Sequence, residues 1–118
     1  MEKIEKPWGY EVIWAKTDKY VAKFLHINPH SRLSLQFHRK KEETVYVLEG
    51  NLKLTLDENS SQVSSGKESF LGPGAVVHVA PGRVHRFGAE ALPVVLCEVS
   101  TPELDDVIRL DDDYKRTN

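Results

Sequence analysis

The feature that most limits how this chain can fold is the grouping of its apolar residues into short runs separated by turn-forming residues. Turns are indicated at Pro29-His30-Ser31, Glu49-Gly50-Asn51, Gly72-Pro73-Gly74 and Ala80-Pro81-Gly82. Proline fixes φ at a value that suits a turn, while glycine and asparagine tolerate positive φ. Short apolar runs with turns about every eight to twelve residues are typical of a β-sandwich or a closed barrel.

Apolar spacing of the helical kind is nearly absent, so we predict an all-β protein. Ten short strands with hairpin spacing favour a double-sheet jelly-roll barrel, in which the mouth is the usual ligand site. We assign no chemistry to the polar, Ser-rich loop Glu58–Gly66. The expected strands are Tyr10–Trp14, Tyr20–Ile27, Leu33–His38, Thr44–Leu48, Leu52–Leu56, Glu68–Leu71, Val76–Val79, His85–Phe87, Val94–Val99 and Val107–Leu110.

Length and composition set the class of protein. With 118 residues, of which 40% are hydrophobic, we expect one domain spanning residues 1–118. The net charge of −2 gives no general attraction to nucleic acid or to an anionic membrane, and we expect neither as a partner. No stretch approaches the roughly 20 apolar residues of a transmembrane helix. The first residues lack the apolar core of a signal peptide, and the single cysteine, Cys97, has no internal partner, so we expect a cytoplasmic protein.

A group of metal-binding residue types follows the strand expected at Leu33–His38. Alternation along a strand places Gln36 and His38 on one face, roughly 6 to 7 Å apart. Glu43 follows shortly after, and His85 follows a later turn. Imidazole and carboxylate bind divalent transition metals, and a glutamine carbonyl oxygen is a weaker donor. These donor types do not distinguish between Zn, Fe, Mn and Co. A single histidine on a strand is more often a half-exposed polar residue than a metal ligand.

The spacing of these residues resembles the two motifs of the cupin superfamily. Four residues separate His38 from Glu43 and six separate Glu43 from Gly50. In most cupins the first motif is His-x-His followed by Glu and Gly, and the second contains Gly, a Pro-x-Gly turn and His. Gln36 stands where the first histidine would be. The resemblance implies a cupin jelly-roll with one divalent metal ion held by Gln36, His38, Glu43 and His85.

Three further segments, Lys6–Val12, Leu33–His38 and Leu104–Tyr114, resemble the C-terminal cupin domain of type II phosphomannose isomerases. In those proteins a nucleotidyltransferase domain precedes the cupin, so for this chain we expect only the isomerase type of activity. The resemblance implies interconversion of mannose 6-phosphate and fructose 6-phosphate. In that reaction a metal acts as Lewis acid on the sugar oxygens while a base moves a proton between adjacent carbons.

Several residues are candidates for the remaining roles. Lys41 stands where the family has an arginine that is proposed to be catalytic, and His78 is a candidate base on a strand. Arg39 and Arg86, next to the two motifs, are candidates for holding the phosphate, and Tyr46 for donating to a substrate oxygen. Each has an ordinary alternative: a solvated surface charge, a hydrogen-bonded structural histidine or a packed tyrosine.

Two other functions remain open. His38, Glu43 and His85 alone form the two-histidine, one-carboxylate set of non-haem Fe(II) oxygenases, although a firm fourth ligand would occupy a site that oxygen needs. A metal-containing cupin that binds sugar without catalysis is the other alternative. We also expect a homodimer, because sheet edges and apolar outer faces are commonly covered by a second copy and two-fold dimers are the most frequent assembly.

Overall fold

The computed structural model describes residues 1–57 and 67–116. The predicted loop Glu58–Gly66 lies outside the described residues. Within them every regular element is a β-strand, which confirms the all-β prediction. In that part of the chain no helix is long and apolar enough to cross a membrane.

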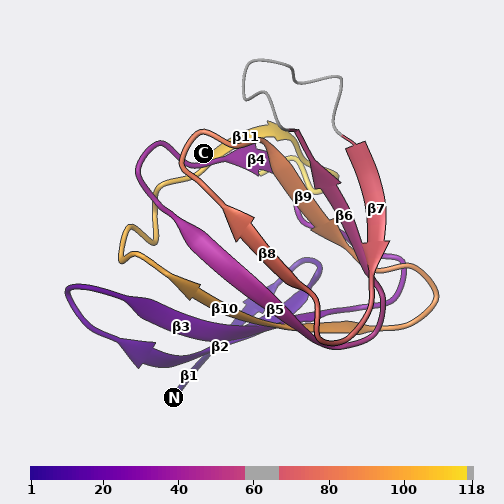
Figure 1. Cartoon of the computed structure of the whole chain (residues 1–118), viewed down its shortest axis with the longest axis horizontal. Helices are drawn as coiled ribbons and strands as arrows, with labels where there is room; N and C mark the ends of the chain where they lie inside the picture. Colours follow the sequence, from indigo (N-terminus) through magenta and orange to yellow (C-terminus); the bar gives the residue numbers. More distant parts are fainter. Residues whose placement is uncertain (58–66, 117–118) are drawn as a thin grey trace.

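The strands form two antiparallel sheets that curve around a shared interior (Figure 1). The six-stranded sheet has the order β1 (Glu2–Lys6), β2 (Gly9–Lys16), β3 (Val21–Ile27), β10 (Val94–Ser100), β5 (Glu43–Glu49) and β8 (Val76–Val79). The five-stranded sheet has the order β11 (Ile108–Asp111), β4 (Leu35–Phe37), β9 (His85–Gly88), β6 (Leu52–Leu56) and β7 (Lys67–Leu71). Each sheet therefore combines strands from distant parts of the sequence.

The inward face of the six-stranded sheet changes character along its strands. On β3 the buried Lys23 lies two residues before the buried Leu25, on the same face of the sheet. On β10 the buried Leu96 is followed by the buried Glu98. The apolar end of this face packs into the hydrophobic core, which includes Trp8, Leu25, Val45, Val47, Leu52 and Leu96. The charged end is left to line a cavity.

Several strand ends differ by one or two residues from the sequence prediction, and two differences bear on the architecture. β1 was not predicted, because its residues Glu2–Lys6 are mostly charged; it forms an antiparallel hairpin with β2. The strand predicted for Leu33–His38 is shorter, since β4 covers only Leu35–Phe37. His38 lies just beyond the end of β4. The direction of its side chain is therefore not set by the alternation of side chains along that strand.

Candidate metal centre and cavity

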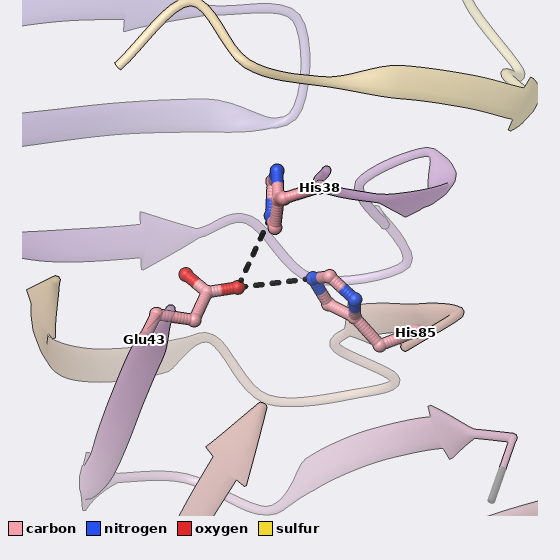
Figure 2. Close-up of side chains that lie close together, drawn as sticks. All are labelled: His38, Glu43 and His85. Carbon is pink, nitrogen blue, oxygen red and sulfur yellow. Dashed lines mark ion pairs between the residues drawn. The ribbon is translucent and has the colours of Figure 1, made fainter. Parts of the chain in front are cut away.

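Three predicted metal ligands meet inside the molecule. His38 follows β4, Glu43 begins β5 and His85 begins β9 (Figure 2). The Oε1 atom of Glu43 lies 3.0 Å from Nε2 of His85 and 3.4 Å from Nε2 of His38. All three side chains are buried, and one possible ligand atom from each lies within 4.8 Å of the others. Two imidazoles and a carboxylate at this separation fit a divalent metal ion.

Both imidazoles are oriented by backbone carbonyl groups. Nδ1 of His85 is hydrogen-bonded to the carbonyl oxygen of Arg83 at 2.9 Å, and Nδ1 of His38 to that of Asp106. A carbonyl oxygen only accepts, so Nδ1 carries a proton in both rings. Nε2 faces Glu43, to which it donates when the ring is charged, and it is available as a metal ligand when the ring is neutral. Hydrogen bonds of this kind fix the ring orientation of metal-binding histidines. The two histidines of the candidate site are therefore oriented by groups outside the triad.

The loop that carries His38 is held by the side chain of Asp106. Its carboxylate accepts backbone hydrogen bonds from Lys40 at 2.7 Å, Lys41 at 2.9 Å and Arg39 at 3.1 Å. These hydrogen bonds lower the pKa of Asp106 to about 2, and the bond from Lys40 has the largest effect. Asp106 thus contacts both His38 and the loop that follows it, a role that the sequence did not suggest.

Glu43 is poised to be a ligand in its charged form. Burial alone would raise its pKa, but hydrogen bonds with His38 and His85 and the charge of Lys41 lower the pKa of Glu43 well below its ordinary value. Metal binding requires a deprotonated carboxylate, so no proton has to be removed from Glu43 near neutral pH.

The predicted fourth ligand, Gln36, lines the same cavity. It lies on β4 directly opposite His85 of β9, and its Nε2 atom donates to the carbonyl oxygen of Ser34 at 3.4 Å. Its place beside His85 is compatible with a fourth donor. Coordination by Gln36 stays a prediction.

A network of buried charges that the sequence reasoning missed adjoins the metal centre. Nζ of Lys41 lies 3.4 Å from Glu98 and 3.6 Å from Glu43, and Nζ of Lys23 lies 3.2 Å from Glu11 and 3.8 Å from Glu98. Burial, followed by the charge of Glu43, raises the pKa of Glu98 to about 8. Burial alone would lower the pKa of Lys41, but Glu98 and Glu43 outweigh it and raise that pKa. Lys41 is therefore charged at neutral pH, and it contacts the buried carboxyl groups of both Glu43 and Glu98.

The cavity beside the triad has a volume of about 230 Å³. Its walls include the three candidate ligands, Gln36 and the charged residues just described. Three further cations, Lys6, Arg109 and Arg116, also line it. A negatively charged ligand small enough for this space would meet both a metal centre and cationic side chains.

Four predicted site residues, His78, Tyr46, Arg39 and Arg86, do not line this cavity. His78 and Tyr46 lie on the outer face of the six-stranded sheet, one residue out of phase with the inward-facing Val79 and Val45, and the imidazole of His78 contacts Glu42. Arg39 is exposed, and its guanidinium lies 5.9 Å from the centre of the Phe37 ring. These positions correct the roles predicted for His78, Tyr46 and Arg39 in the cavity.

Arg86 is buried, but it faces away from the cavity because it alternates with His85 on β9. Its Nε donates to the carbonyl oxygen of Leu33 at 2.9 Å, and its Nη2 to that of Asp111 at 2.8 Å. The guanidinium therefore ties β11 and the residues that precede β4 to β9 within the five-stranded sheet. This contact corrects its predicted role in holding phosphate.

Solved structures share this architecture. CapF, a capsular polysaccharide assembling protein from Staphylococcus aureus, matches with a TM-score of 0.79 and 16% identity over 93% of this chain and 34% of that one. An RmlC-like cupin from Shewanella frigidimarina matches with a TM-score of 0.74 and 17% identity over 88% and 86% of the two chains. These likenesses, together with the two antiparallel sheets, define the fold as a cupin.

Sequence comparison gives the family. The family model described as mannose-6-phosphate isomerase C-terminal matches residues 1–112, and the chain belongs to that family. Mannose-1-phosphate guanylyltransferase of Escherichia coli K12 is 32% identical over 96% of this chain, and alginate biosynthesis protein AlgA of Pseudomonas aeruginosa is 26% identical over 97%. The chain spans about a quarter of the length of these relatives, 23% in both cases.

Proposed function

We propose that this chain is a metal-dependent sugar-phosphate isomerase that interconverts mannose 6-phosphate and fructose 6-phosphate. The observation that carries the proposal is the buried set of His38, Glu43 and His85, with both imidazoles oriented by backbone carbonyls. Membership of the mannose-6-phosphate isomerase C-terminal family supports the choice of substrate. The fit of two nitrogen donors and one carboxylate supports one divalent ion, Zn, Fe, Mn or Co.

The chain's own residues suit such a reaction. A bound divalent ion would supply Lewis-acid stabilisation of negative charge on the sugar oxygens. Lys41, held by Glu43 and Glu98 at the cavity wall, would donate a hydrogen bond to a sugar oxygen as charge develops there. The buried walls would exclude water, which strengthens these interactions.

The test combines two measurements on one sample. Protein purified without chelator or nickel resin is analysed for metal content and is then assayed for mannose 6-phosphate isomerisation in a coupled reaction. Metal-dependent turnover supports the proposal. A stoichiometric metal content with no turnover over a range of divalent ions would refute the isomerase assignment while leaving the metal site in place.

A second candidate function is non-haem Fe(II) oxygenase chemistry, favoured by the two-histidine, one-carboxylate composition of the triad. It predicts bound iron and substrate-dependent oxygen uptake. If Gln36 is a firm fourth ligand, this candidate loses an open position. Tight sugar-phosphate binding without turnover or oxygen uptake would instead indicate a non-catalytic, metal-containing sugar-binding cupin.

We also propose that the chain forms a homodimer through the outer face of the six-stranded sheet. Phe24, Cys97, Tyr46 and Val76 lie opposite one another across four adjacent strands, and Trp14 stacks on Phe24. Strands are about 4.8 Å apart, so this apolar row crosses most of the sheet. Contiguous exposed apolar patches of that extent mark interaction sites, and a second copy presents the same patch about a two-fold axis.

A cytoplasmic location is likewise proposed from composition.

A further inference from the structure

Arg109 lies in a row of side chains that begins at the metal centre. On the five-stranded sheet His85 of β9 is opposite Gln36 of β4, and Gln36 is opposite Arg109 of β11. All three line the cavity. Directly opposite residues on neighbouring antiparallel strands project on the same side of the sheet. Arg109 therefore faces the same space as the candidate metal ligands, two strands away from His85.

Arg116 reaches the cavity from the segment that follows β11. The side chain of Asp112 accepts hydrogen bonds from the backbone N–H groups of Tyr114 and Arg116 and from the guanidinium of Arg116, with Nε at 2.9 Å. The Asp112 side chain is only 6% exposed. Tyr114 packs against the hydrophobic core. The turn is thus fixed at two points, and it holds Arg116 against the cavity.

The two arginines bring like charges together. Burial, followed by the charge of Arg116, lowers the pKa of Arg109, and Asp112 partly opposes this. Asp112 is itself hydrogen-bonded to the Nε and Nη2 atoms of Arg116. Repulsion between close cations is relieved when an anion binds between them. A third cation, Lys6, lines the same cavity.

We propose that Arg109 and Arg116 form an anion subsite for the phosphate group of a phosphorylated ligand whose other end reaches the metal centre. The proposal rests on the proposed function for its choice of a sugar phosphate. Neighbouring strands are about 4.8 Å apart, so the backbones of His85 and Arg109 are separated by roughly 10 Å. Arg109 lines the same cavity as the candidate metal ligands, so one ligand in that cavity can contact both.

Two arginines form a better phosphate site than the cations next to the metal. Lys41 and Lys23 contact the buried carboxyl groups of Glu98 and Glu11, and Arg116 contacts Asp112, so pairing does not separate the lysines from Arg116. Arginine offers a planar fork of N–H donors that matches two phosphate oxygens at once, which a lysine does not. The subsite would therefore select for the phosphate ester and set the distance at which the sugar meets the metal centre.

The experiment measures binding of inorganic phosphate by isothermal titration calorimetry to the full chain as purified. Arg109→Gln and Arg116→Gln are compared with wild type, and Arg39→Gln serves as the matched control because Arg39 is exposed outside the cavity. We expect each cavity variant to weaken phosphate binding at least tenfold and Arg39→Gln to leave it unchanged. Arg109→Lys, which keeps the charge but not the fork, is expected to bind with intermediate affinity. Thermal unfolding confirms that each variant is folded.

Metal content and turnover, measured on the same samples, separate the subsite from the proposed function. Arginine-dependent phosphate binding without isomerisation supports the subsite and counts against the isomerase. Wild-type phosphate affinity in folded Arg109→Gln and Arg116→Gln overturns the subsite, and if both variants also retain the wild-type KM for mannose 6-phosphate the isomerase stands without it. A raised KM for mannose 6-phosphate with unchanged metal content, in both cavity variants, supports both.

Discussion

Most half-exposed sheets bury an apolar face and expose a polar one. The six-stranded sheet departs from this rule on both of its faces. At one end of its inner face Glu11, Lys23 and Glu98 are each less than 9% exposed. On its outer face Tyr46 is 45% exposed and Val76 is 61% exposed. Buried charges and exposed apolar patches are the informative departures from normal burial, since scattered exposed apolar residues are common.

The difference indicates that the two faces serve different ends. Taking an ion out of water costs several kcal/mol even after relaxation, so the charges on the inner face do not persist as a means of stabilising the fold. They lie beside His38, Glu43 and His85 and line the same cavity. The outer face carries apolar groups in a cross-strand row, which is the surface of the proposed dimer. Substitutions on each face test this division.

The largest effect is expected at Glu43, on the inner face of β5. Glu43→Ala removes the only carboxylate of the triad, and we expect metal affinity to fall more than a thousandfold, with loss of any metal-dependent turnover. Metal content and a competition titration with a coloured chelator measure this. Thr44→Ala, on the outer face one residue along, is the control and should retain its metal. Stoichiometric metal in Glu43→Ala would show that the ion binds elsewhere.

The next effect concerns stability. Lys23→Met leaves Glu11 buried without its cation and Glu98 with Lys41 alone, and we expect the free energy of unfolding to fall by about 3 kcal/mol. This should lower the melting temperature by on the order of 10 °C. Lys53→Met is the control, because its ion pairs with Glu68 and Glu90 lie at the surface and contribute little. Equal losses in the two variants would mean that the buried network is no more important than a surface pair.

The contrast between the faces also explains what the sequence revealed. His38, Glu43 and His85 were found because they match the two motifs of a known superfamily, with His38 and Glu43 close together in the first motif. Lys23 and Glu98 were missed, although each interrupts an apolar strand at a position whose neighbours two residues away are buried. Every second residue of a strand points to the same face of the sheet. A charged residue among the positions that point to the buried face is the signal that would have found them.

Arg109 and Arg116 were beyond such reasoning. Their place depends on how β11 pairs with β4 and on the turn held by Asp112, which are contacts between distant parts of the chain. Arg39 and Arg86 were preferred because they are next to the motifs, but proximity in sequence does not decide which way a side chain faces. On β9 the residue after an inward histidine must point outward.

A smaller effect is expected on the outer face. The double change Tyr46→Lys with Val76→Lys places like charges across the apolar row, and we expect the proposed dimer to dissociate at least a hundredfold more readily, with metal content unchanged. Sedimentation equilibrium at several concentrations measures the assembly. Leu92→Lys, an exposed apolar position in the turn before β10, is the control and should stay dimeric. A monomeric wild type would end the dimer proposal.

The smallest effect is expected at Asp106, which holds the loop of His38. Asp106→Asn weakens three backbone hydrogen bonds at a largely solvent-accessible site, so we expect a loss of about 1 kcal/mol at neutral pH. Urea unfolding of metal-free wild type and variant, repeated at several pH values, measures it. Asp105→Asn, exposed in the same segment, is the control.

The pH dependence of that difference has a definite sign. The folded pKa of Asp106, about 2, lies below its ordinary value of 3.8, so the folded state releases a proton more readily than the unfolded chain. Its contribution is complete above about pH 4 and is lost as the pH falls through 2. The difference in unfolding free energy between wild type and Asp106→Asn should therefore shrink across that interval. A difference that stays constant down to pH 2 would mean that the ionised carboxylate does not hold the loop, and that the contact of His38 with the backbone of Asp106 positions the histidine by itself.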